Sequence, residues 1–330
     1  MRAIVIAEPG GPEVLQMRDV AAPTPERAEV RVRVRATAVN RADLLQRMGR
    51  YPAPRDAPQD IPGLEFAGEV DAVGPAVDAW RPGDRVFGLA GGGAYAELLV
   101  CHGRALARMP ERMSFEQAAA TPEAFITAYD AMVTQAKLKS GEHVLIHAAG
   151  SGVGTAAIQL ARALGARAIA TARTAAKLER AVELGLAPRM SVLVQHDARF
   201  ADEVLARTGG RGADVVLELV GGPYVAEDVR CAAAAGRIVL VGMLAGAQAE
   251  LDQAAVMRKR LVLRGTVLRA RPLEEKIEAM QAFSRYVVPL LGDGTLEAVV
   301  GRTFPLSQAA DAHRYVASDQ GFGKVVLTVD

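Results

Sequence analysis

The chain has 330 residues, of which about half are apolar, and 39 basic against 38 acidic side chains give it a net charge of +1. This balance offers no basic face for nucleic acid or an anionic membrane, and no apolar run approaches the roughly 20 residues of a membrane-spanning helix. The length exceeds the size at which single hydrophobic cores stop growing, so we expect two domains in a soluble, cytoplasmic protein without a signal peptide, with Cys101 and Cys231 reduced.

The first third of the chain is predicted to be mostly β. Short apolar runs separated by Gly and Pro clusters predict strands at 4–7, 30–38, 69–73, 85–89 and 94–100. Within the second run, V-R-V-R-V-R alternates with period two, which is typical of a half-exposed strand. From Phe115 the apolar period becomes helical, and we place a domain boundary there, at 122/123.

Residues 143–165, HVLIHAAGSGVGTAAIQLARALG, predict a buried strand, a turn of small residues and a helix. This arrangement favours a dinucleotide, whose pyrophosphate would bind the turn and the helix N-terminus. Gly150 and Gly152 are followed by Thr155 where a strict G-x-G-x-x-G would end, so A-x-S-x-x-G, with Ala149, Ser151 and Gly154, is the better register. The predicted cofactor turn comprises Ala149, Gly150, Ser151, Gly152, Val153 and Gly154; a glycine-rich turn without nucleotide is the alternative.

A second strand at 168–172 ends at Arg173, where an NAD site would place Asp or Glu for the ribose 2′-hydroxyl. Arg173, Thr174 and Lys177 instead supply two cations and a hydroxyl at the start of a helix. This set favours the 2′-phosphate of NADPH. Ordinary surface bases at a helix start are the alternative.

Further strands at 191–194, 215–219, 238–241 and 261–265, with helices near 200–207 and 224–234, predict a doubly wound parallel sheet. The chain then continues into a helix at 273–291 and a last strand at 324–329, which we expect to rejoin the first domain. The fold class is therefore α/β, with one domain at 1–122 and 268–330 and the other at 123–267.

Several segments carry the pattern of one enzyme family; they are AEPGGPEVL (7–15), NRADLLQRMGRY (40–51), IPGLEFAG (61–68), PEAFITAY (122–129) and HAAGSGVGTAAIQLA (147–161). In these segments the chain resembles the zinc-independent quinone oxidoreductases of the medium-chain dehydrogenase/reductase superfamily, and the resemblance covers essentially its whole length. Within that group it most resembles the p53-inducible type, whose members reduce quinones with NADPH. The resemblance implies a GroES-like, mostly β catalytic domain and a Rossmann-type dinucleotide-binding domain.

The resemblance also implies that no metal is bound. Zinc-dependent relatives place Cys, His and Cys where this chain has Asn40, Leu64 and about Glu123, which do not form a zinc ligand set. A quinone needs little electrophilic help, because its conjugated ring spreads the charge of an added hydride to oxygen. Positioning and one hydrogen-bond donor for the oxyanion can then suffice.

Three residues are candidates for the catalytic pocket. Tyr51, in the loop R-Y-P-A-P, is the first candidate for the oxyanion donor, although it could instead pack on proline at the surface. Asn40 can bind nicotinamide or substrate, or can stabilise a turn. Asp43 lies one helical turn before Gln46 and is equally plausible as a proton relay or as an N-terminal helix residue.

The resemblance implies further cofactor contacts at Thr127, Gly242, Met243, Phe322 and Lys324. Core packing for Met243 and an ordinary strand-edge charge for Lys324 are the alternatives. Family members often carry an Asn-Tyr pair where this chain has Val194-Gln195-His196, so His196, if protonated, could replace part of that contact.

The leading function is NADPH-dependent reduction of a small-molecule quinone. An NADPH-dependent reductase of enoyl thioesters or alkenals would use the same cofactor and a metal-free site. A third possibility is an NADPH-binding sensor or structural protein without turnover. The resemblance further implies a homodimer, formed by edge pairing of residues 261–265 across a two-fold axis.

Overall fold

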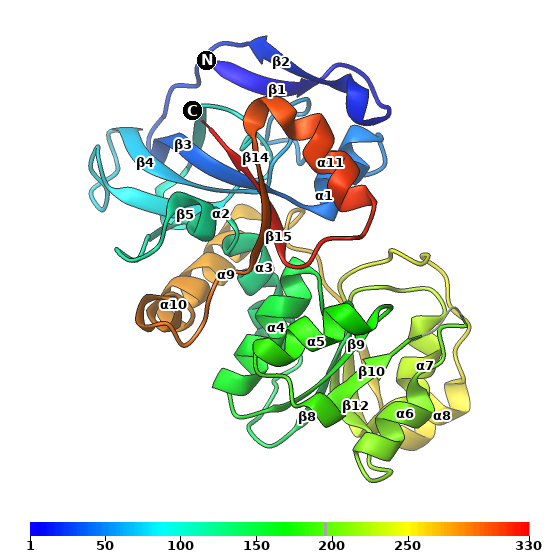
Figure 1. Cartoon of the computed structure of the whole chain (residues 1–330). Coiled ribbons are helices and arrows are strands. Elements are labelled where there is room, and N and C mark those ends of the chain that lie inside the picture. Colours follow the sequence, from blue (N-terminus) through cyan, green and yellow to red (C-terminus); the bar gives the residue numbers. More distant parts are fainter. Residues whose placement is uncertain (195–196, 330) are drawn as a thin grey trace. The chain divides into compact units, whose positions relative to one another are not determined.

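The computed structural model describes residues 1–194 and 197–329, so the interpretation of Gln195 and His196 lies outside the described residues. The chain forms two compact units (Figure 1). Unit 1 consists of Met1–Ile126 together with Leu268–Asp330, and unit 2 of Thr127–Val267. In the part of the chain that the structure describes, no helix has both the length and the apolar character needed to cross a membrane.

Unit 1 is built on a seven-stranded sheet in the order β14-β15-β3-β4-β5-β7, with β6 also paired to β3. Its strands are β3 (Glu29–Val39), β4 (Glu65–Val73), β5 (Arg85–Leu89), β6 (Leu98–His102), β7 (Leu106–Arg108), β14 (Val300–Pro305) and β15 (Lys324–Thr328). All neighbours are antiparallel except β14 and β15. A separate antiparallel pair joins β1 (Arg2–Ile6) to β2 (Leu15–Asp19).

The alternation in β3 gives the strand one apolar and one charged face, as predicted. Val30, Val32 and Val34 are buried in the core of unit 1. Arg31 and Arg33 on the other face both pair with Asp71 of β4, at 2.7 and 2.6 Å. Cross-strand pairing of opposite charges therefore helps to fix the register of β3 against β4.

The helices of unit 1 connect and cover these strands. They are α1 (Arg41–Arg47), α2 (Phe115–Ala119), α9 (Leu273–Tyr286), α10 (Val288–Asp293) and α11 (Ala309–Ala317), with single 3-10 turns at Pro12–Val14, Gly103–Ala105 and Leu306–Gln308. The helix predicted at 273–291 is divided at Val287, because Pro289 in the first turn of the next helix cannot donate a backbone hydrogen bond to the preceding turn. The strand predicted at 94–100 begins only at Leu98. Helix α3 (Pro122–Tyr129) crosses the boundary between the units.

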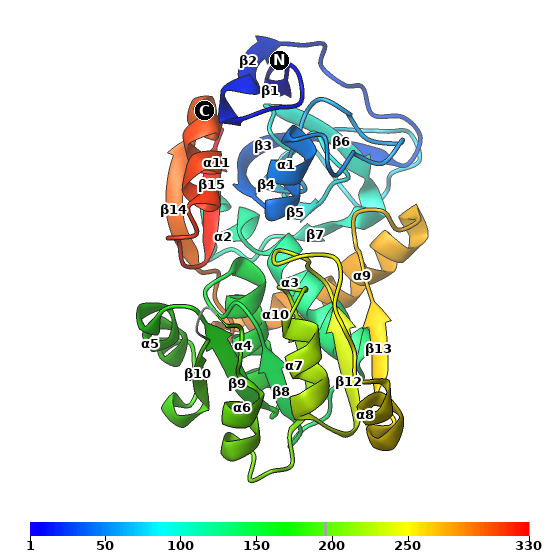
Figure 2. The same ribbon diagram turned by 90° about the vertical axis from the view of Figure 1, so that its right-hand side faces the viewer.

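Unit 2 is the predicted doubly wound domain. Six parallel strands lie in the order β10-β9-β8-β11-β12-β13. Figure 2 labels β10, β9, β8, β12 and β13 in this sequence across the unit. They are β8 (His143–Ile146), β9 (Arg167–Ala172), β10 (Ser191–Leu193), β11 (Ala213–Glu218), β12 (Ala232–Leu240) and β13 (Val262–Gly265). The connecting helices are α4 (Gly152–Ala163), α5 (Ala175–Glu183), α6 (Ala201–Arg207), α7 (Tyr224–Cys231) and α8 (Gln253–Lys259), with a π-helical stretch at Asp130–Gln135 and a 3-10 turn at Pro188–Met190.

This strand order reverses direction between β8 and β11. Ligands of open parallel sheets bind beyond the carboxyl ends of the strands at such a switch point. The segments that follow β8, β9, β11 and β12 are therefore the parts of unit 2 positioned for a dinucleotide.

Candidate functional site

The turn after β8 has the geometry of a phosphate-binding turn. Ala148 takes a left-handed conformation, with φ +50°, and Ser151 is the N-cap of α4, where its Oγ accepts a hydrogen bond from Gly154 N at 3.0 Å. Gly154 has no room for a side chain, because a Cβ there would lie 2.3 Å from the Ala148 carbonyl oxygen. Helix and strand thus approach more closely than any other residue would allow.

The residues present fit the pyrophosphate of a dinucleotide. Ala149 and Gly150 are buried, while Ser151, Gly152 and Val153 are partly exposed at the start of a 12-residue helix. N–H groups in the first turn of a helix have no acceptor within it, and the helix dipole there favours negative charge. The turn therefore combines small side chains with an electrostatic preference for phosphate.

The predicted 2′-phosphate residues lie together after the neighbouring strand β9. Arg173 and Thr174 are exposed, Thr174 is the N-cap of α5, and Lys177 lies partly buried in the first turn of that helix. Because β8 and β9 pair in parallel, with Ile146 opposite Ala170, both turns lie at the same edge of the sheet. This geometry is compatible with a phosphorylated ribose at Arg173.

Two further cofactor candidates follow β12. Gly242 comes close to β11, since a Cβ there would lie 2.4 Å from the Leu219 carbonyl oxygen. Met243 is 68% exposed, which excludes the core-packing alternative. Thr127 is partly exposed on α3.

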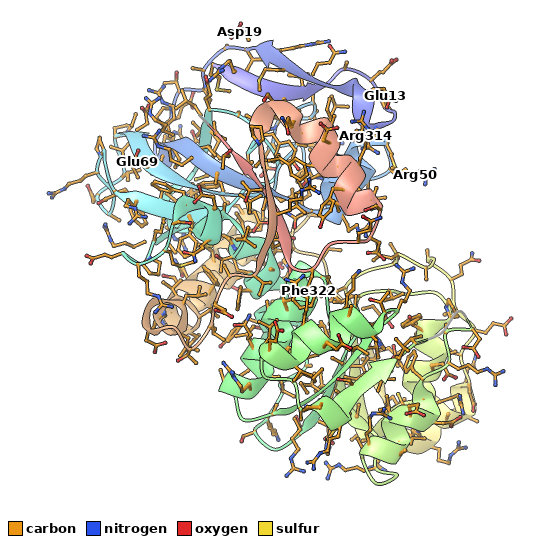
Figure 3. All side chains as sticks on the ribbon, in the orientation of Figure 1. Glu13, Asp19, Arg50, Glu69, Arg314 and Phe322 are labelled. Carbon is orange, nitrogen blue, oxygen red and sulfur yellow. The ribbon has the colours of Figure 1, made fainter. Side chains whose placement is uncertain are left out.

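In unit 1, Lys324 is part of a buried ion pair and not a strand-edge charge. β15 lies between β14 and β3, and Lys324 is only 6% exposed. Its Nζ lies 2.6 Å from Oε1 of the fully buried Glu65 and donates to Asn40 Oδ1 at 2.5 Å, while Asn40 Nδ2 donates to the same Glu65 oxygen at 2.9 Å. Asn40, Glu65 and Lys324 therefore form one locked triad. Phe322, labelled in Figure 3, precedes β15 and is 4% exposed.

Asp43 is buried beside this triad and caps α1. Its Oδ2 accepts from Asn40 N at 2.7 Å and from Tyr95 Oη at 3.2 Å, and its Oδ1 accepts from Gly63 N at 3.2 Å. Burial raises the pKa of Asp43 to about 6, against the lowering effect of these N–H donors and of nearby cations. Tyr95 also contacts His313 Nε2 at 3.2 Å, so the carboxyl group lies at one end of a buried hydrogen-bonded chain.

Tyr51 is accompanied by Arg269, a residue that the sequence analysis did not identify. The Arg269 guanidinium lies 5.4 Å from the centre of the Tyr51 ring, and it donates to the Gly91 carbonyl oxygen at 2.7 Å and to Gln46 Oε1 at 2.6 Å. Arg269 is buried and Tyr51 is partly buried. Burial raises the pKa of the Tyr51 phenol, against the lowering effect of the Arg269 charge. No local pattern connects two residues so far apart in the chain, so only the fold could reveal this pair.

Glu123 is the second residue whose chemistry the sequence analysis missed. Its backbone N donates to Glu65 Oε2 at 2.8 Å. Burial, and then the charge of Glu65, raise the pKa of the Glu123 carboxyl to about 8, against the lowering effect of Lys324. A carboxyl group with a pKa raised this far can act as a general acid near neutral pH. From the sequence, Glu123 is only the counterpart of a zinc ligand. Leu64, the counterpart of another, is apolar and 1% exposed.

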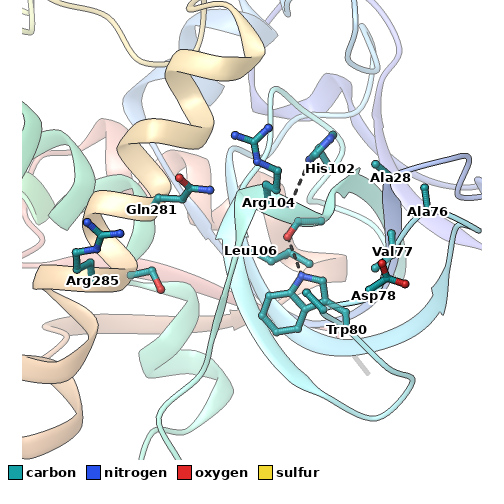
Figure 4. Close-up of a pocket in the computed structure, with 13 residues that line it drawn as sticks. Ala28, Ala76, Val77, Asp78, Trp80, His102, Arg104, Leu106, Gln281 and Arg285 are labelled. Carbon is teal, nitrogen blue, oxygen red and sulfur yellow. Dashed lines mark hydrogen bonds between the residues drawn. The ribbon is translucent and has the colours of Figure 1, made fainter.

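A pocket of about 660 Å³ lies elsewhere in unit 1 (Figure 4). Its lining includes Trp80, His102, Arg104, Gln281 and Arg285. None of the predicted site residues lines it.

Two family models match the chain: the alcohol dehydrogenase GroES-like domain at residues 26–111 and the zinc-binding dehydrogenase at residues 152–285. A quinone oxidoreductase from Lama guanicoe is 34% identical and covers 99% of this chain and 97% of its own length. The crystal structure of Escherichia coli quinone oxidoreductase complexed with NADPH has a TM-score of 0.87 at 29% identity, covering 99% of this chain and 100% of its own. The CurK enoyl reductase has a TM-score of 0.86, also at 29% identity, covering 100% of this chain and 99% of its own.

Proposed function

The chain belongs to the quinone oxidoreductase family of medium-chain dehydrogenases, and on this basis we propose that it uses NADPH to reduce quinones by direct hydride transfer without a metal. One observation carries the choice of cofactor: the turn of residues 149–154 is followed, at the same edge of the sheet, by Arg173 and Lys177 in place of an acidic residue. A carboxylate there would bind a ribose hydroxyl but would repel a phosphate.

The substrate class follows from the family and from the chemistry of unit 1. Asn40, Leu64 and Glu123 cannot form a zinc site of thiolates and imidazoles, and the Asn40 side chain already donates to Glu65. An acceptor that stabilises its own negative charge suits such a site better than a saturated ketone.

When bound, NADPH supplies the hydride, and one proton completes the two-electron reduction of quinone to hydroquinone. We assign to Tyr51 the hydrogen bond to the developing oxyanion, with the positive charge of Arg269 favouring the anion. We assign the proton to Glu123, whose raised pKa keeps it protonated at neutral pH. The Asn40–Glu65–Lys324 triad holds the backbone of Glu123 in place through Glu65.

Reduction of an activated C=C bond is the second candidate. It is supported by the similarity to the CurK enoyl reductase and by the proton held on Glu123, since addition of hydride to an enoyl thioester must be followed by protonation of carbon. The third candidate is a protein that binds NADPH without turnover, and the experiment described next also tests it.

Anaerobic stopped-flow kinetics with NADPH against quinones, enones and enoyl thioesters would test these proposals. We expect small quinones to oxidise NADPH rapidly in the presence of the protein, and to oxidise NADH only slowly. Faster reaction with enoyl thioesters would favour the second candidate. Tight NADPH binding without oxidation by any acceptor would refute both enzymatic proposals.

We also propose that the protein is a homodimer joined through β13. This strand is one edge of the unit 2 sheet. Val262 on it is 49% exposed, and Met257 on the preceding helix α8 is 77% exposed. Size-exclusion chromatography with light scattering would refute this proposal if it gave a monomer at working concentration. The cytoplasmic location stays a prediction.

A further inference from the structure

Four polar side chains meet in the interior of unit 2, beneath the proposed cofactor turns. His147 follows β8, Thr171 lies in β9, Glu218 ends β11 and Asp228 lies in α7. His147, Glu218 and Asp228 are completely buried and Thr171 is 1% exposed. His147 Nδ1 lies 2.8 Å from Thr171 Oγ1, and its Nε2 lies 2.8 Å from Asp228 Oδ1 and 3.7 Å from Glu218 Oε2.

In each carboxyl group of this cluster, one oxygen has a hydrogen-bond partner and the other has none. Glu218 Oε1 accepts from the backbone N–H groups of Val220 and Gly221, and Asp228 Oδ1 faces His147. Glu218 Oε2 and Asp228 Oδ2 are buried without a hydrogen-bond partner. Two unpaired carboxylate oxygens in the interior would be strongly destabilising, so a proton, a metal ion or a buried water has to satisfy them.

The distances favour a proton over a metal. His147, Glu218 and Asp228 each offer one ligand atom, all within 4.8 Å of one another. Around tetrahedral zinc, neighbouring ligand atoms are about 3.3 Å apart. The separation of 2.8 Å between His147 Nε2 and Asp228 Oδ1 is instead that of a hydrogen bond. The separation of 3.7 Å between His147 Nε2 and Glu218 Oε2 is longer than the spacing of two zinc ligands. The rings of Phe200 and Tyr224 lie 4.8 and 5.1 Å from the His147 ring and enclose it on two sides.

We propose that Glu218 and Asp228 share one proton, and that this carboxylic acid–carboxylate pair, with His147, is a positioning group for the cofactor. The inference rests on the proposed NADPH site. Glu218 holds the N–H groups of the loop after β11, and its carbonyl oxygen accepts from Gly242 N after β12 at 3.3 Å. His147 directly precedes the left-handed Ala148 of the phosphate turn. One hydrogen-bonded network therefore fixes three of the segments that face the dinucleotide.

The network is electrically neutral when His147 is protonated and the acids share their proton. The neighbouring carboxylates raise the pKa of His147 against the effect of burial, and burial raises the pKa of Asp228 to about 8. The other titratable neighbours stay neutral in this range, because burial raises the pKa values of the Tyr224 phenol and the Cys231 thiol above their usual values. The positive charge of Arg173 lowers the pKa of Tyr224, against the larger effect of burial.

Loss of the shared proton above about pH 8 would leave two carboxylates facing each other. Their repulsion would displace the loop that Glu218 holds, and the added negative charge would oppose the phosphates of the cofactor. The raised pKa belongs to an acid, so the competent state exists at lower pH and is lost as pH rises. We expect the Kd of the wild type for NADPH to increase above about pH 8 by at most about tenfold per pH unit.

Amide substitutions test the shared proton, because an amide presents one acceptor and one donor in fixed places. In Asp228→Asn the oxygen can face His147 while the NH₂ group donates to Glu218, and Glu218→Gln can keep its two backbone donors while its NH₂ group donates to Asp228. Each single variant should lose the pH dependence of NADPH affinity and should bind NADPH more tightly than the double variant. The double variant places two NH₂ groups face to face, and it should bind at least about tenfold more weakly and have a lower Tm.

The measurements are NADPH fluorescence titration between about pH 6 and pH 10, thermal unfolding, and metal content by plasma mass spectrometry, all on the full chain. Single variants as impaired as the double, a wild-type affinity that is flat through pH 8, or a stoichiometric metal that Asp228→Asn removes would each overturn the inference. A wild type that does not bind NADPH would refute the proposed function. The ranking of Tm among the variants would still decide whether the acids share a proton.

Discussion

Replacing Arg173 with alanine tests the assignment of NADPH most directly. The guanidinium is exposed at the end of β9, beside the N-terminus of α5, where a 2′-phosphate would accept charge-assisted hydrogen bonds. Such bonds contribute about 1.5–3 kcal/mol when shielded from water, and solvent screening at an exposed position reduces this to about 1–2 kcal/mol. The Kd for NADPH should therefore rise by about 5- to 30-fold.

NADH lacks the 2′-phosphate, so its Kd should change by less than about twofold. Arg189→Ala is the matched control, because it removes the same charge from an exposed arginine. Arg189 precedes β10 and so lies at the amino-terminal ends of the parallel strands, whereas Arg173 lies at their carboxyl ends. Isothermal titration of both nucleotides into the three proteins at one ionic strength measures the ratio. Equal losses for NADPH and NADH in Arg173→Ala, or an equal loss of NADPH in the control, would refute the phosphate assignment.

Three further experiments test other parts of the site. Because the pKa of Glu123 is about 8, kcat for quinone reduction should fall as pH rises through about 8. The Glu123→Gln variant should be slower, and its kcat should not depend on pH in this range. A variant whose stopped-flow pH profile matched that of the wild type would contradict the role of Glu123 as proton donor. Gly154→Ala should destabilise the fold by about 1–3 kcal/mol and weaken NADPH binding, whereas Gly265→Ala, where a Cβ meets nothing within 4 Å, should do neither in denaturation and titration experiments. Lys324→Met should cost about 3–5 kcal/mol in urea unfolding by stranding the buried Glu65, and combining it with Glu65→Gln should restore most of that stability; no rescue would mean that packing, not charge, dominates.

Sequence patterns within single segments were sufficient to predict much of the secondary structure and which side chains are buried. The apolar strand, small turn and helix at 143–165 were sufficient to predict β8, the turn and α4, because each step of that pattern is a local preference of the chain. The alternation in β3 likewise predicted which side chains enter the core. Together with the family resemblance, these segments predicted both parts of the fold.

Tertiary structure decided what depends on partners distant in the sequence. The alanines from Ala232 are good helix material, yet they begin β12, because Ala232 pairs with Ala213 of β11 and burial outweighs intrinsic propensity. The sequence around Lys324 is equally typical of a surface charge, but β15 lies between two strands and brings Lys324 beside Glu65.

The same holds for the groups that carry the proposed chemistry. Arg269 reaches Tyr51, and Asp228 reaches His147, only because the fold brings together residues that no sequence period relates. Proton affinity and charge in these clusters depend on burial and on the facing side chain. A local pattern can therefore indicate where a nucleotide binds, but only the packed interior determines which side chains hold a proton.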